Sequence, residues 1–118
     1  MASSPSLRFR GRREVHQVIS HGRRFRHELG RIAWGRVPDI RGARVLFVVS
    51  TAVAKRSTDR NRIRRQLLEA FRRQWRLEPF PVAAVVSVDR AVAGFPSRKR
   101  NLLAAGLARR LSVLASRP

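Results

Sequence analysis

The stretch that decides the fold is Asp59–Trp75, which reads DRNRIRRQLLEAFRRQW. At about 100° per residue its apolar side chains gather on one side of a helix. These side chains are Ile63, Leu67, Leu68, Ala70, Phe71 and Trp75. Thr58 or Asp59 is the expected N-cap, because a short side-chain oxygen accepts a hydrogen bond from an unpaired N–H of the first turn. The pattern predicts an amphipathic helix that packs by one face.

The other face of this helix is crowded with arginines. Asp59 and Glu69 are the only acids against nine bases between Lys55 and Arg76. Like charges four residues apart destabilise a helix by roughly 0.2–0.5 kcal/mol per pair. An ordinary solvated face would mix the two signs, so a bound polyanion explains the pattern better than solvation does.

The whole chain repeats this bias. Its 118 residues include 27 Lys+Arg and 7 Asp+Glu, a formal net charge of +20, and 43% are hydrophobic. This composition predicts one folded domain at 7–118 behind a loose, Ser/Pro-rich tail at 1–6. Arginine's planar fork fits phosphate oxygens, but charge alone leaves RNA, DNA and an anionic membrane as candidate partners. The sequence has no cysteine, no signal-peptide pattern and no apolar run of about 18 residues, so a cytoplasmic protein is expected.

Outward from the arginine helix, further elements follow from the apolar pattern. They are a helix at 12–21 followed by Gly22 as its C′ residue, strands at 29–37, 44–50 and 82–88, and a final helix with Ser97 as its N-cap. The order predicts an α/β (α+β) two-layer sandwich, with three helices on a mixed sheet of about four strands. The expected core is Val45, Phe47, Val49, Ile63, Leu67, Phe71, Val82, Val85, Leu103 and Leu107.

No catalytic centre is visible in the sequence. A metal-dependent nuclease needs clustered carboxylates, and an acid–base ribonuclease needs two positioned histidines. The acids occur singly, and His16, His21 and His27 are not spaced to meet. His21 is more simply a partner of a helix C-terminus. We therefore expect no protein catalytic residue and no metal bound by the protein alone.

Apolar residues outside the arginine helix have two interpretations. Val15, Ile19, Ile32 and Trp34 either belong to the core or form a surface on which single-stranded bases stack, with Trp34 the more open. Arginines nearby in the sequence would give such a surface its phosphate contacts. They are Arg24, Arg26, Arg31 and Arg36.

The segments FVVS at 47–50, RNRIRR at 60–65 and LLEAFR at 67–72 resemble the protein component of bacterial ribonuclease P. Residues 14–22, the Leu-rich terminal helix and the length also fit, so the resemblance extends over about residues 7–115. It implies a ribosomal-protein-like α/β sandwich, with the arginine helix inside a left-handed crossover. It also implies a catalytic RNA subunit that uses Mg²⁺ to cleave the 5′ leader from precursor tRNA, as an endonuclease, without a metal held by the protein.

The resemblance places two sites on this chain. By similarity, the residues that contact the RNA subunit are Arg60, Asn61, Arg62, Arg64 and Arg65. We expect the neighbouring cations Lys55, Arg56, Arg72 and Arg73 to bind RNA as well. The expected leader cleft, between the first helix and the sheet, is lined by Val15, Ile19, Trp34, Phe47 and Ser50.

The chain departs from the family pattern after Ser50. Thr51, Ala52 and Ala54 stand where a Lys-Lys pair and a Gly are usual, and Lys55 and Arg56 would replace the missing lysines. The first-helix aromatics are replaced by Val15 and Ile19. These departures concern the leader cleft more than the arginine helix.

Other functions remain to be weighed. A ribosomal-type RNA-binding protein would share the electrostatics without a role in cleavage. A helix-turn-helix DNA reader lacks its first helix, because residues 54–58 predict none. A membrane-surface helix would need the apolar face that the core requires. We expect RNA as the partner, and neither DNA nor a membrane.

Overall fold

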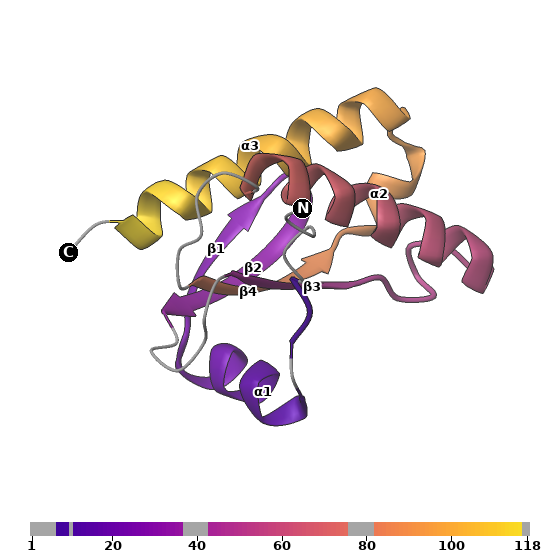
Figure 1. The fold of residues 1–118 in the computed structure, drawn as a ribbon. Coiled ribbons are helices and arrows are strands. Elements are labelled where there is room, and N and C mark those ends of the chain that lie inside the picture. Colours follow the sequence, from indigo (N-terminus) through magenta and orange to yellow (C-terminus); the bar gives the residue numbers. More distant parts are fainter. Residues whose placement is uncertain (1–6, 10, 37–42, 76–81, 117–118) are drawn as a thin grey trace, which may run out of the picture.

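The computed structural model describes residues 7–9, 11–36, 43–75 and 82–116 (Figure 1). The elements are α1 Arg12–His21, β1 Arg23–His27, β2 Gly30–Arg36, β3 Arg44–Val48, α2 Ser57–Trp75, β4 Val82–Val88, the 3-10 turn η1 Arg90–Gly94 and α3 Ser97–Ser116. The predicted α+β class and element order are confirmed. The expected tail at 1–6 lies outside the described residues.

The strands form one mixed sheet in the order β1-β2-β4-β3. β2 lies antiparallel to both β1 and β4, whereas β3 and β4 run parallel. A parallel pair needs a crossover connection, and α2 supplies it. The helices α2 and α3 cover one face of the sheet and α1 lies against the other (Figure 1).

The main core lies between the sheet and the helices α2 and α3. Nine of the ten predicted core residues are buried, and Leu103 is half-buried against them. Phe71 stands at its centre, with ring centroids 5.0 Å from Phe47 and 4.8 Å from Trp75 in edge-to-face geometry. On the other face, Val18 of α1 packs on Ala83 and Val85. α2 is therefore fixed by its apolar side, as its periodicity predicted.

The ends of two helices differ from prediction. α2 begins at Ser57, so Thr58 and Asp59 lie in its first turn and neither is the N-cap; the Arg56 carbonyl accepts the first backbone hydrogen bonds instead. Gly22 does follow α1, in an extended conformation with φ −74°. A Cβ there would clash with the carbonyl oxygens of Val18 and Trp34. Glycine is needed because the backbone of β2 passes so close.

Three features of the sheet and the last helix differ from the sequence prediction or were not part of it. Strand β1 was not assigned from the sequence, because its residues RRFRH include only one apolar side chain. β3 ends at Val48, two residues before the predicted end of this strand at 50, and Val48 is 44% exposed. Arg100, a charged residue of the first turn of α3, is buried. Its guanidinium donates to the Gln66 side chain at 2.7 Å and the Phe95 carbonyl at 2.8 Å.

Candidate nucleic-acid interface

The first half of α2, together with the two residues before it, exposes cations to solvent. Lys55, Arg56, Arg62 and Arg65 are exposed, and no carboxylate of the described residues lies within ion-pair distance of any of them. Asn61 is exposed beside them. The guanidinium groups of this surface, which we call the arginine face, turn outward and keep their charge available to a polyanion.

Two members of the arginine face are held by neighbouring groups. The Arg60 guanidinium donates to the carbonyl oxygens of Ala54 at 3.0 Å and Lys55 at 2.8 Å, which fastens the connection after β3 to α2. Arg64 donates to the Asn61 side-chain oxygen at 2.7 Å. These bonds fix side-chain positions without neutralising charge, so part of the ordering cost of binding is met in advance.

Toward the end of α2, the arginines of this face are paired with an acid. Arg72 and Arg73 lie 3.8 Å and 3.9 Å from the Glu69 carboxylate. Such exposed pairs contribute little, about 0–1 kcal/mol, but they reduce the net charge of this turn. On this face, the cations without a carboxylate partner among the described residues therefore lie toward the beginning of α2.

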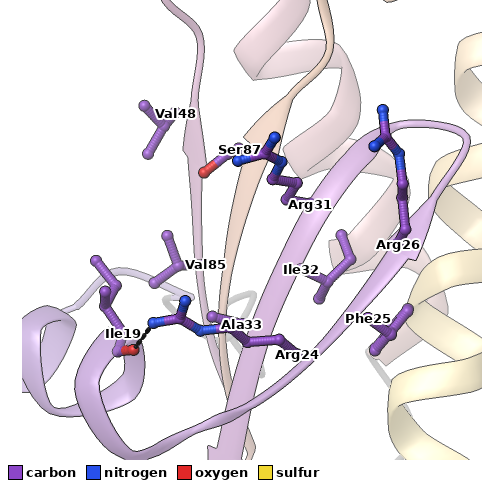
Figure 2. A pocket seen from close by; sticks show the side chains of 10 residues that line it. All are labelled: Ile19, Arg24, Phe25, Arg26, Arg31, Ile32, Ala33, Val48, Val85 and Ser87. Carbon is purple, nitrogen blue, oxygen red and sulfur yellow. Dashed lines mark hydrogen bonds between the residues drawn. The ribbon is translucent and has the colours of Figure 1, made fainter.

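A hollow lies on the opposite side of the sheet, beside α1 (Figure 2). It has a volume of about 610 Å³. Ile19 of α1 and Ala33, Val48 and Val85 of three strands give it apolar walls. The remaining lining residues are Arg24, Phe25, Arg26, Arg31, Ile32 and Ser87.

Strand pairing sets the arginines of this hollow. In the antiparallel β1–β2 pair, Arg24 is opposite Ala33 and Arg26 is opposite Arg31, so all four side chains belong to the α1 side of the sheet. Figure 2 shows Arg24 donating a hydrogen bond to the Ile19 carbonyl, which ties β1 to α1. The result is an apolar floor with guanidinium groups along one side.

The hollow continues into two neighbouring cavities, and we call the three together the α1 groove. One, of about 590 Å³, shares Ile19 and extends along α1 to Val15, Arg12 and Phe9. The other, of about 300 Å³, shares Arg26, Arg31 and Ser87 with the hollow and reaches Ser50, Asp89 and Arg90. The groove therefore crosses the sheet from α1 to the end of β4.

Three of the five residues predicted for the leader cleft line this groove: Val15, Ile19 and Ser50. Trp34 and Phe47 do not, and that part of the prediction is wrong. Trp34 is 6% exposed and Phe47 2% exposed, both in the core under α2 and α3. Alternation along each strand sends them to the helix-covered face, away from Ala33, Leu46 and Val48. Those alternating neighbours, with Val85 and Ser87 of β4, were missed by the sequence prediction.

The three histidines have different surroundings. His16 is within hydrogen-bond distance of Ser20, 3.3 Å away on the same helix, and His21 is exposed. His27 accepts a hydrogen bond from the Leu29 N–H at 3.1 Å. Burial lowers the pKa of His27, and nearby Arg110 lowers it further, partly offset by Glu28. Among the described residues no cluster of His, Cys, Asp or Glu is suited to hold a metal ion.

Within the same described ranges, no helix has the length and apolar character needed to cross a membrane. No curated protein matches the sequence. Two solved structures show the same fold. The ribonuclease P protein of Staphylococcus aureus superposes with a TM-score of 0.76 at 12% identity, covering 95% of this chain and 97% of that one. That of Thermotoga maritima, in complex with 1-(4-fluorophenyl)-2-thiourea, gives 0.74 at 20% identity, covering 87% and 98%.

The sequence itself supplies the stronger link. The description of the Ribonuclease P family matches residues 4–109, which include both the arginine face and the α1 groove. The chain thus belongs to the Ribonuclease P family, as a protein component of the bacterial enzyme.

Proposed function

We propose that this subunit of ribonuclease P binds the RNA subunit through its arginine face and the 5′ leader of precursor tRNA in its α1 groove. The observation that carries the proposal is the presence of two separate cationic surfaces on opposite sides of one sheet. One surface suits a folded RNA, and the other suits a single strand. The RNA, with its Mg²⁺, would carry out hydrolysis.

The arginine face fits a structured RNA because it is a convex rod with guanidinium groups at helical spacing. Arg62 and Arg65 are one turn apart and free of carboxylate partners among the described residues. Each phosphate they neutralise would release a counterion, so affinity would fall with salt by about 0.7–0.9 log units per contact. Arg60 and Arg64, already oriented by hydrogen bonds, would add contacts at low entropic cost.

The α1 groove fits a single strand because its floor is apolar and its cations stand to one side. Bases would lie against Ile19, Val48 and Val85, while phosphates would meet Arg24, Arg26 and Arg31. Besides these aliphatic side chains the groove includes Phe9 and Phe25, and apolar contact and stacking do not depend on the identity of the base. We expect leader binding that tolerates sequence changes.

Assigning the chemistry to RNA is consistent with what the protein side chains offer. The groove includes one acid, Asp89, and one histidine, His16, at different ends. A pair of groups that could transfer protons at one phosphate needs hydrogen-bond reach of the same atoms. The protein would instead lower the electrostatic cost of bringing two polyanions together, which reduces the Mg²⁺ that the RNA needs.

Reconstitution tests the proposal. The protein is combined with the RNA subunit and a precursor tRNA, and 5′ trimming is scored at low Mg²⁺ with and without each component. We expect cleavage to require RNA and to be stimulated strongly by protein at low Mg²⁺. Turnover by protein alone that survives nuclease treatment, or a complete lack of stimulation as for a ribosomal-type protein, would contradict the proposal.

A further inference from the structure

A further hollow lies between α2 and α3, outside the α1 groove, and it shares Glu69 and Arg73 with the end of the arginine face. Its volume is about 680 Å³, within the range of ligand-sized sites. The two helices run side by side over the sheet (Figure 1). The lining residues are Gln66, Glu69, Ala70, Arg73 and Gln74 of α2 and Arg98, Asn101, Leu102 and Ala105 of α3.

The walls of this hollow are held at both ends. Arg100 of α3 donates to the Gln66 side chain at 2.7 Å, and the Trp75 indole N–H donates to the Ala108 carbonyl at 2.8 Å. The small residues Ala70 and Ala105 lie between these two bonds. The hollow is therefore a fixed groove, which we call the α2–α3 groove.

Three kinds of side chain meet in the α2–α3 groove. Leu102 gives it an apolar surface and is 66% exposed, so its side chain is open to a ligand. Gln74 and Asn101 present amides, each with donors and an acceptor. Arg73 and Arg98 bring guanidinium groups. An apolar plate, amides for a polar edge and cations for a phosphate together match the parts of a nucleotide.

The groove is also continuous with the arginine face. Residues 62, 65, 66, 69 and 73 of α2 follow the three- and four-residue spacing of one helix side. Glu69 is the one acid in the lining, and its carboxylate lies within 3.9 Å of both Arg72 and Arg73, so it does not oppose an anion alone. An RNA held by Arg62 and Arg65 would pass the mouth of the groove.

We propose that the α2–α3 groove receives one unpaired nucleotide of the RNA subunit. Its base lies on Leu102, its polar edge meets Gln74 and Asn101, and its phosphate meets Arg98. This inference rests on the proposed function, because it places the nucleotide next to RNA already bound by the arginine face. It adds a contact that depends on the base, where the arginine face depends on phosphate charge.

The test compares matched variants in binding to the full RNA subunit. Gln74→Ala combined with Asn101→Ala removes the amides that would hold the polar edge of the base, so we expect affinity to fall roughly tenfold. This pair changes no charge, so the slope of log affinity against log salt should stay the same. Leu102→Ala should act in the same direction, while Val113→Ala, another exposed apolar residue of α3, should not. Arg98→Gln should also weaken binding, because it removes the proposed phosphate contact. Its control is Arg109→Gln, at an exposed arginine of α3 that does not line the groove, and this variant should bind as the native protein does.

Chemical probing of the RNA supplies the second readout. The native protein should protect one unpaired nucleotide that the Gln74→Ala/Asn101→Ala variant leaves reactive. Suppose that Gln74→Ala/Asn101→Ala and Leu102→Ala both bind the RNA and protect it as the native protein does, while Arg62→Gln/Arg65→Gln binds weakly. The groove proposal is then wrong and the proposed function stands. If the arginine variant also binds normally, both are overturned. If Leu102→Ala lowers tRNA processing but protects the RNA subunit as the native protein does, the groove has a different occupant and the nucleotide proposal is wrong.

Discussion

The arginine face and the α1 groove carry similar charges in different ways. On α2 the cations share a helix with the apolar residues that anchor it, so one segment supplies both the support and the contact surface. In the α1 groove, Arg24, Arg26 and Arg31 come from two strands, and the apolar floor comes from α1 and three strands. A rod can be built from one periodic segment, whereas a groove depends on how several segments pair.

The largest expected effect tests the anchoring of the rod. Phe71→Ala or Trp75→Ala should lower the free energy of unfolding by about 3–5 kcal/mol, because each ring is buried and in edge-to-face contact. Urea denaturation measures this loss. Leu102→Ala, on the exposed side of the neighbouring helix, is the control and should change stability by less than about 0.5 kcal/mol. Equal losses would mean that α2 is not anchored by its apolar side.

The next effect separates charge from support. Arg62→Ala combined with Arg65→Ala should leave the unfolding curve unchanged and weaken binding to the RNA subunit by about tenfold or more. The slope of log affinity against log salt should flatten by about 1.4–1.8, for two lost phosphate contacts. Arg36→Ala with Arg109→Ala removes two exposed arginines elsewhere and serves as the control. An unchanged slope in the α2 variant would remove the arginine face from the interface.

A smaller effect concerns the α1 groove. Arg24→Ala combined with Arg26→Ala should reduce affinity of the holoenzyme for precursor tRNA by roughly tenfold, with affinity for leaderless tRNA preserved. The comparison of the two substrates, in competition with each other, is the measurement. A parallel loss for both substrates would place these arginines against the body of the tRNA and not against the leader.

The smallest effect is on stability near the far edge of the sheet. Because the folded state lowers the pKa of His27, the unfolded chain takes up a proton near pH 6.5 before the folded protein does. Stability should therefore be retained above about pH 6.5 and decrease as the pH falls through that value. His27→Gln should remove this part of the pH dependence in urea denaturation. The prediction is contradicted if the free energy of unfolding changes between pH 7.5 and pH 5.5 by the same amount in the native protein and in His27→Gln.

Much of the fold was predictable because α2, β4 and α3 carry strong apolar patterns. The edge strand β1 was not, because the sheet buries little of it and its side chains are mostly arginine. The arginine face could be predicted from the helical period of one segment. Predicting the α1 groove would have required the strand register, which sets Arg24 opposite Ala33. Trp34 looked open on its own strand, and only the placement of two helices buries it. Nothing in the sequence indicated that Arg100 would donate to carbonyls of η1 and of Phe95 after it.

The central position of β4 has a consequence for how the molecule assembles. Phe47 of β3 pairs with Val86 of β4, 39 positions later, and β2 also pairs with β4. During synthesis the β1–β2 hairpin and β3 have no strand to join them until that segment leaves the ribosome. Contacts so distant along the chain slow folding. A chain ending after α2 should remain without its complete sheet, and the complete domain should form only after both β4 and α3 have left the ribosome.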